Sequence, residues 1–353
     1  MAYRDIVVIG ASAGGLEALQ RLLAALPGNM DAAILVVLHT SNHEGSVLPN
    51  ILGRAGPLPA LHPEDGAPIR KGRLYIAPPN VHMIVADGHV QLVAGPRENL
   101  HRPAIDPLFR SAAAAYGPRV IGVVLTGLLD DGTSGLMVVR ASGGEAIVQD
   151  PETATFASMP RSALKQVPDA RVLPLEQIPG MLVRLSCEKL PDEAVAGRFP
   201  SHAEKDVKIA EFDMSEIENE ARLGTPSEFA CPDCGGVLWE IIESGFLRYR
   251  CRVGHAFTAK YLEAEQRHAT GSALWAALRA LEESISLSHR LAQRAGDWRQ
   301  SALHELYQER AGAKEKHAKI LRDFLLQVNA RGEEEKLIDE EQGIPRQDLE
   351  ESA

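Results

Sequence analysis

Residues 6–19 read IVVIGASAGGLEAL, and this stretch decides the fold. Four β-branched residues lead into a turn that contains three glycines, and the apolar residues after the turn are spaced as on a helix. A strand, a glycine-rich turn and a helix in this order are typical of the first unit of a parallel α/β sheet. Open parallel sheets gather their sites at the carboxyl ends of the strands, so we expect a functional site at this turn.

Two kinds of chemistry suit such a turn. The N–H groups at a helix N-terminus can bind a pyrophosphate or stabilise a developing oxyanion. A dinucleotide site usually has an acidic residue at the end of the second strand, whereas the second predicted strand, residues 34–38, ends in His39. Ser12 after the first strand and His39 after the second therefore indicate a nucleophile and its base.

A third predicted strand, residues 120–125, runs into a loop that contains Asp130 and Asp131. Since this loop also follows the carboxyl end of a strand, one of its aspartates can meet Ser12 and His39. The chain order Ser, His, Asp is no objection, because catalytic triads are defined by geometry. We expect the backbone N–H groups of Ala13 and Gly14 to form the oxyanion hole.

Five motifs in this order make the chain resemble the catalytic domain of chemotaxis protein-glutamate methylesterases of the CheB type. They are GASAGG at residues 10–15, His39, YIAPPNVHM at residues 75–83, Arg102-Pro103 with DPLF at residues 106–109, and LTG at residues 125–127 before Asp131-Gly132. The resemblance covers roughly residues 4–187. It implies that Ser12 is the nucleophile, that His39 is the base and that Asp131 orients the histidine.

The resemblance also implies an activity and further site residues. It predicts hydrolysis of glutamate methyl esters in chemoreceptors, with glutamine deamidation as a possible side activity and no cofactor for catalysis. Further candidates for the oxyanion hole or for substrate binding are His82, Arg102, Thr126 and Gly127. The alternatives are a hairpin position for His82 and a solvated side chain for Arg102.

The chain departs from the family pattern in two places. The family commonly has Thr and Met where this chain has Ala13 and Thr40. Its aspartate loop commonly reads TGMGNDG, where this chain has Leu128, Leu129 and Asp130. A residue other than glycine at position 129 restricts the backbone of the loop.

Composition limits the remaining possibilities. The length of 353 residues suits one α/β domain and something smaller, and no stretch approaches the roughly 20 apolar residues of a membrane span. We therefore expect a cytoplasmic protein without membrane insertion. Residues 1–190 hold 16 of the 37 basic and 17 of the 48 acidic residues, which leaves 21 basic and 31 acidic residues for the rest. This balance does not favour a nucleic-acid partner.

Three of the four cysteines lie close together in the second half. Cys231 and Cys234 form one turn, and Cys251 with His255 forms a second turn after a predicted hairpin. Two such turns provide the four ligands of a tetrahedral zinc site, in which no position stays open for a substrate. We expect a structural zinc ribbon.

The predicted organisation is a doubly wound, mostly parallel α/β domain with an inserted β-hairpin over residues 1–190. An acidic linker (191–228), with one helix at 215–222, leads to the zinc ribbon (229–258). A helical hairpin (259–330), broken at Gly296-Asp297, would dock on a partner or on a second copy. An acidic, disordered tail (331–353) would follow.

Three functional hypotheses follow from the sequence. The first is a serine hydrolase of the methylesterase type, the second a nucleotide-binding α/β protein, and the third a non-catalytic scaffold that binds through the ribbon. The predicted first strand begins near residue 4, so we also expect control by the C-terminal segments and not by an N-terminal receiver domain.

Overall fold

The computed structural model describes residues 2–39, 47–86, 88–190, 199–210, 224–243 and 245–341. The chain forms two compact units, residues 1–262 with 343–353 and residues 263–342, and we describe each by itself. The loop that follows His39, the helix expected at 215–222 and the end of the predicted tail lie outside the described residues.

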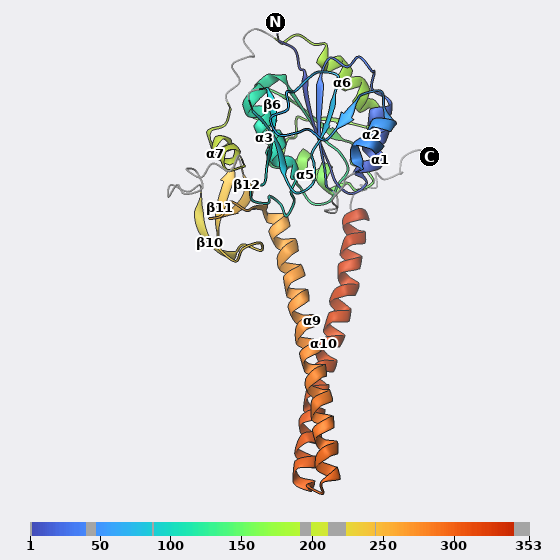
Figure 1. The fold of residues 1–353 in the computed structure, drawn as a ribbon, viewed down its shortest axis with the longest axis vertical. Coiled ribbons are helices and arrows are strands. Elements are labelled where there is room, and N and C mark those ends of the chain that lie inside the picture. Colours follow the sequence, from blue (N-terminus) through green and yellow to red (C-terminus); the bar gives the residue numbers. More distant parts are fainter. Residues whose placement is uncertain are drawn as a thin grey trace, which may run out of the picture. The chain divides into compact units, whose positions relative to one another are not determined.

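A β-sheet lies at the centre of the first unit (Figure 1). It has seven strands in the order β3-β4-β2-β1-β7-β8-β9. Every neighbouring pair in this sheet is parallel. The strands are β1 (Ile6–Ala11), β2 (Ala33–Leu38), β3 (Ala60–Leu61), β4 (Leu74–Ile76), β7 (Val120–Val124), β8 (Glu145–Gln149) and β9 (Arg171–Leu173). The central strands are continuous apolar runs because both faces of the sheet are covered.

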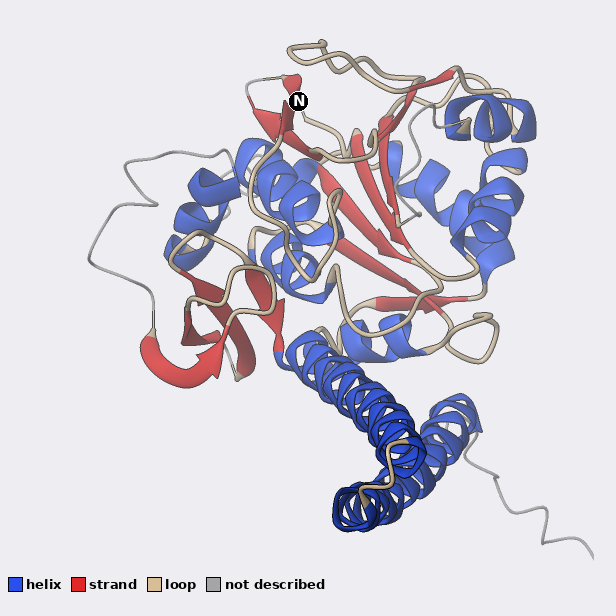
Figure 2. Cartoon of the chain, turned by 60° about the horizontal axis from the view of Figure 1, so that its bottom comes forward, coloured by secondary structure: helices blue, strands red, loops and turns tan. Residues whose placement is uncertain are grey.

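Helices cover the sheet on both sides (Figure 2). Val8 and Leu35 face the side of α3 (Ile105–Tyr116), α4 (Thr133–Ala141) and α5 (Ser158–Gln166). Val7 and Ile34 face the side of α1 (Gly15–Ala24), α2 (Leu48–Ala55) and α6 (Ile178–Ser186). This alternation gives the sheet one apolar core on each face and confirms the prediction of a doubly wound, mostly parallel α/β fold.

The predicted inserted hairpin is also present. Strands β5 (His82–Ala86) and β6 (His89–Val93) form a separate antiparallel pair, and β5 packs against α3. Short 3₁₀ helices at Gly117–Arg119 and Leu175–Gln177 complete the connections of this part of the chain.

A second, four-stranded antiparallel sheet belongs to the same unit. Its strands are β10 (Thr225–Ala230), β11 (Val237–Glu243), β12 (Phe246–Cys251) and β13 (Ala256–Thr258), and we call them together the C-terminal sheet. The hairpin expected between the two cysteine turns is formed by β11 and β12.

One helix lies within the segment that we expected to be a linker. Helix α7 (Ser201–Ala210) is folded and packs against α3, with Ala203 and Asp206 fully buried. The linker prediction is therefore wrong for these residues. The polar composition of this segment indicated exposure to solvent. The charge of Asp206 is instead buried and is paired with arginines of β12.

The second unit consists of two long helices. Helix α9 (Ala259–Asp297) begins in the first unit, and α10 is Ser301–Glu341. Contacts of Glu282 with Arg322 and of His289 with Glu315 show that the helices run antiparallel, and Leu278, Ala318 and Leu325 form their core. The predicted break at Gly296-Asp297 is confirmed. Helix α10 extends to Glu341 and so includes the first residues of the predicted tail, and the disorder of the tail stays a prediction.

The surface of these helices carries large exposed side chains, including Trp275, Ile320 and Phe324. Docking on a partner or on a second copy stays a prediction. None of the helices in the described ranges combines the length and the apolar character that a membrane span requires.

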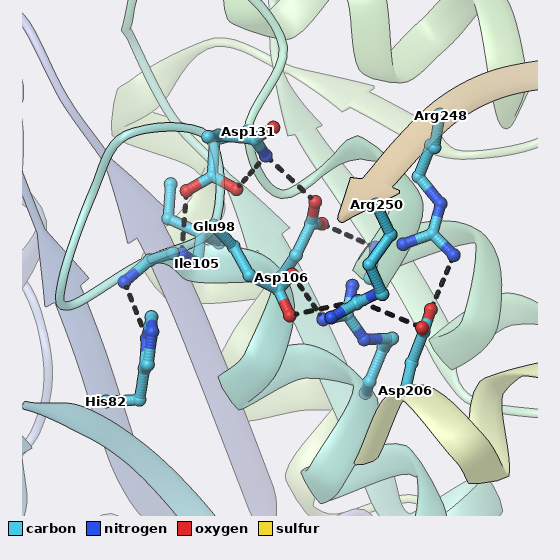
Figure 3. Close-up of polar contacts among 12 residues, drawn as sticks. His82, Glu98, Ile105, Asp106, Asp131, Asp206, Arg248 and Arg250 are labelled. Carbon is cyan, nitrogen blue, oxygen red and sulfur yellow. Dashed lines mark hydrogen bonds and ion pairs between the residues drawn. The ribbon is translucent and has the colours of Figure 1, made fainter. Parts of the chain in front are cut away.

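A buried network of ions joins the C-terminal sheet to the α/β part (Figure 3). Arg250 of β12 contacts Glu98 at 3.3 Å and Asp206 at 2.9 Å, Arg248 contacts Asp206 at 2.5 Å, and Arg110 of α3 contacts Glu98 at 2.5 Å. Burial opposes ionisation of both acids, but the neighbouring arginines outweigh burial and hold the pKa of Glu98 and of Asp206 below the ordinary values.

We predict that Asp206→Ala lowers the free energy of unfolding by about 3–5 kcal/mol, because it removes the buried carboxylate that Arg248 and Arg250 share. Urea unfolding of the full chain measures this loss. The control is Asp169→Ala, which removes an exposed ion pair with Arg140 and should cost about 1 kcal/mol or less. Equal losses in the two variants would contradict a structural role for the network.

Candidate active site

Ser12 lies on the turn between β1 and α1. Its N–H donates to the carbonyl of Thr126 (3.1 Å), and its own carbonyl accepts from Gly15 (2.8 Å). Gly14 has φ 69° and caps α1, a left-handed conformation that glycine adopts without strain. The turn therefore fixes the backbone of Ser12 at the carboxyl edge of the sheet.

The structure brings the three predicted triad residues together. Nδ1 of His39 lies 3.2 Å from Oγ of Ser12, and Nε2 lies 2.9 Å from Oδ2 of Asp131. A buried carboxylate only accepts, so Nε2 carries the proton and Nδ1 is free to accept the proton of the serine hydroxyl. The three side chains form one hydrogen-bonded line in which the histidine can act as a base.

Asp131 is completely buried and is held by three donors. Besides His39, it accepts from the N–H of Ile105 (2.7 Å) and from Nδ2 of Asn99 (2.9 Å). Burial alone would raise the pKa of Asp131, but the hydrogen bond and the electrostatic attraction from His39, together with the Ile105 N–H, lower it below the ordinary value. The carboxylate is thus ionised and fixed before substrate binds.

The candidates for the oxyanion hole divide into two groups. Among the described residues, the N–H groups of Ala13 and Gly14 have no acceptor, so they are available to a substrate. The N–H of Gly127 donates to Phe156, and the Oγ1 of Thr126 contacts Ala13 and Phe156. A Cβ at Gly127 would lie 2.9 Å from the Cβ of Ser12, so this glycine is needed for the close approach of the nucleophile.

His82 and Arg102 are bound to backbone carbonyls and N–H groups. His82 is buried in β5, where Nε2 lies 2.9 Å from the carbonyl of Pro96. Its Nδ1 accepts from the N–H of Ala104, next to Ile105 (Figure 3). Arg102 donates to the carbonyls of Ala94 and Gly95. This arrangement favours the hairpin alternative for His82 and gives Arg102 a structural contact in place of full solvation.

Comparisons with known proteins assign the chain to a family. The model of the family described as CheB methylesterase matches residues 7–182. A protein of Leptospira interrogans is 37% identical over 187 residues, which make up 53% of this chain and 97% of that protein. The chain belongs to the CheB methylesterase family.

Two further matches extend this result. A protein of Anaeromyxobacter dehalogenans, named protein-glutamate methylesterase/protein-glutamine glutaminase 5, is 40% identical over 184 residues, about half of each chain. The Leptospira relative carries the same two activities in its name as a provisional assignment. The crystal structure of the Thermotoga maritima CheB methylesterase catalytic domain matches with a TM-score of 0.50 and 35% identity, over 52% of this chain and all of that one.

Two residues near the triad of this CheB family member were missed in the sequence. Asn99, with φ 50°, binds Asp131, and the ring of His101 stacks on that of His39 with the centroids 3.6 Å apart. Burial and the neighbouring His39 lower the pKa of His101 to about 3, so its ring stays neutral. No spacing rule singles out Asn99, because its partners come from distant segments.

Asp106 lies in the first turn of α3 and does not cap that helix. The N-cap of α3 is Ala104 and not Asp106, since the helix begins at Ile105. The carboxylate of Asp106 instead accepts from the N–H of Gly135 in the first turn of α4 (2.6 Å). Burial and the charge of Asp131 raise the pKa of Asp106 well above its ordinary value.

The four predicted metal ligands also converge. The ligand atoms of Cys231, Cys234, Cys251 and His255 all lie within 4.8 Å of one another. Sγ of Cys234 and Cys251 are 3.7 Å apart, and Sγ of Cys251 is 3.5 Å from Nδ1 of His255. Tetrahedral zinc with Zn–S bonds of about 2.3 Å would place two sulfurs about 3.8 Å apart, so the donor set fits that ion.

Asp130, the residue before the triad aspartate, should make the stability of the protein depend on pH. Asp130 is buried, and its Oδ1 accepts from Oγ1 of Thr258 (2.6 Å). Burial raises the pKa of Asp130 to about 6 in the folded protein, compared with about 3.9 for an unperturbed aspartate. The folded state therefore binds this proton more tightly, and the stability contributed by the protonated carboxyl is lost as the pH rises from about 4 through 6.

We predict that Asp130→Asn, which keeps an acceptor for Thr258 and cannot ionise, becomes more stable relative to the wild type as the pH rises. The expected gain between pH 4 and pH 7.5 is about 1–3 kcal/mol. Urea unfolding at both pH values measures it, and a difference between the two proteins that does not change with pH would contradict the raised pKa.

Proposed function

We propose that this chain is a protein-glutamate methylesterase that acts on methylated glutamates of chemoreceptors. The observation that carries the proposal is the Ser12-His39-Asp131 line within a CheB methylesterase fold. A dinucleotide site usually has an acidic group where His39 stands, and a scaffold would not need an imidazole aligned between a hydroxyl and a carboxylate. The geometry therefore favours the hydrolase over both alternatives.

The first half of the reaction forms an acyl-enzyme. Oγ of Ser12 attacks the ester carbonyl while Nδ1 of His39 takes its proton, and Asp131 stabilises the imidazolium that results. The N–H groups of Ala13 and Gly14 would donate to the oxyanion, each with a contribution of about 3 kcal/mol to the stability of the transition state. The histidine returns its proton to the leaving oxygen, and methanol departs.

The second half restores the enzyme. His39 takes a proton from water, the hydroxide attacks the acyl carbonyl, and the bond to Ser12 Oγ breaks with return of the proton to the serine. The product is a glutamate carboxylate. A glutamine side chain presents the same carbonyl and would release ammonia, so the same residues support the deamidase activity as a side reaction.

We also propose that the C-terminal sheet is a zinc ribbon. The donor set of three sulfurs and one imidazole nitrogen, with the distances given above, supports zinc as the ion. Four protein ligands leave no position for water or substrate, so the ion would fold the two turns of the sheet and take no part in ester hydrolysis. Catalysis needs no cofactor in this proposal.

We predict that Ser12→Ala lowers the rate of methanol release from a methylated receptor fragment by about 10⁴-fold or more, because the nucleophile is lost. Labelling by a fluorophosphonate, which the wild type should undergo at Ser12, should also disappear. Ser272→Ala, which changes an exposed serine of α9, is the control and should behave as the wild type. Unchanged turnover of Ser12→Ala would contradict the proposal.

We predict one zinc ion per chain in the purified protein, measured by mass spectrometry of the metal. The variant with Cys231→Ser and Cys251→Ser should lose the ion, because serine is a poor ligand for zinc. Cys187→Ser is the control, since Cys187 is exposed and lies outside the cluster. Full zinc content in the double variant would show that these cysteines do not bind it.

A further inference from the structure

Two loops that support the triad are in contact with the C-terminal sheet and with the first turn of α9. The first is the 98–101 turn, in which the N–H of Glu98 binds the carbonyl of His101 and the reverse bond is also made. The second is the 128–131 loop, which ends with the triad aspartate. All these residues belong to the first unit, so their contacts can be described together.

Each residue of the 98–101 turn contacts the C-terminal sheet or the first turn of α9, which we call together the C-terminal part. Glu98 pairs with Arg250, and Leu100 packs on the apolar cluster of the C-terminal sheet. Asn99 donates its N–H to Ala256 (2.8 Å) and accepts the N–H of Thr258 on Oδ1 (2.9 Å). His101, stacked on His39, meets the ring of Tyr261 edge-on, with the centroids 5.7 Å apart.

Asn99 therefore bridges two parts of the protein. Its Oδ1 is held by β13, and its Nδ2 donates to the triad carboxylate on the other side. An amide can do this because it carries one acceptor and one donor group on the same rigid plane. Any displacement of β13 would move the donor that helps to fix Asp131.

The 128–131 loop also contacts the C-terminal sheet and the first turn of α9. Leu129, with φ 60°, packs on the apolar cluster of the C-terminal sheet, and Asp130 accepts from Thr258. Lys260 adds a bond to Ser162, whose hydroxyl also donates to the carbonyl of Leu129. Leu129 and Asp130 are two of the three positions at which this loop departs from the family pattern, so the departures coincide with the contacts to the C-terminal sheet.

We propose that Asn99 is a positioning residue of the triad and that the C-terminal sheet, with the first turn of α9, holds it in place. The C-terminal part is then an integral support of the active site and not an independent binding module. This inference rests on the proposed esterase function. The support that Asn99 provides aligns Asp131 and His39. Loss of this support therefore reduces the rate of the chemical step more than it weakens substrate binding.

The first experiment removes the amide without straining the backbone. Asn99→Gly retains the positive φ, and Asn80→Gly is the matched control because Asn80 also has a positive φ (67°) and is exposed. With a methylated receptor fragment as substrate, we expect Asn99→Gly to lower kcat by about 10- to 100-fold at nearly constant KM. Asn80→Gly should have the kinetics of the wild type.

The second experiment tests the dependence on the C-terminal part. Tyr261→Leu removes the ring that contacts His101, whereas Tyr261→Phe keeps it. We expect a lower kcat only for Tyr261→Leu, together with faster hydrogen–deuterium exchange of the peptide that contains residues 97–105. A thermal unfolding curve of each variant separates this local effect from a loss of the whole fold.

Three results would overturn the inference. One is wild-type kcat in Asn99→Gly, a second is equal kcat in the two Tyr261 variants, and the third is a higher kcat in Tyr261→Leu, which would mean that this part blocks the site. Failure of the esterase proposal looks different, because turnover would then be absent in the wild type or unaffected by Ser12→Ala.

Discussion

The structure depends on one buried carboxylate. Asp131 has no exposed surface, so its charge is tolerated only because His39, the N–H of Ile105 and Asn99 all donate to it. These donors come from the end of β2, the start of α3 and the 98–101 turn. The requirement to satisfy one charge therefore fixes three segments relative to each other, and with them the ring that faces Ser12.

The parallel sheet supplies the rest of the alignment. Since β1, β2 and β7 are neighbours and run in the same direction, the segments after them meet at one edge, although His39 is 27 residues from Ser12 and 92 residues from Asp131 in sequence. Gly127 has no side chain, which lets the loop after β7 approach the nucleophile closely. The charged side chains that are buried around this edge each have a partner. The network through Glu98 and Asp206 extends this pairing of buried charges to the C-terminal sheet.

The sequence was sufficient for the features that follow from local patterns. The apolar runs of β1, β2 and β7, the glycine turn and the spacing of the cysteines each have a short-range signal, and the doubly wound fold follows from them. Asn99, His101 and Asp206 have no such signal, because their roles come from partners that are distant in the chain. The acidic composition around α7 indicated solvent exposure, and only the fold shows that β12 provides the arginines that neutralise Asp206.

The central claim is that Ser12 becomes covalently acylated during turnover. Rapid acid quenching of the full chain with a methylated receptor peptide, followed by mass spectrometry of the peptide around Ser12, tests this directly. The account predicts an adduct on Ser12 with the mass of the peptide substrate less methanol, formed before free glutamate product accumulates. Turnover without any adduct on Ser12 under conditions that trap other serine hydrolases, or an adduct on a different residue, would contradict it.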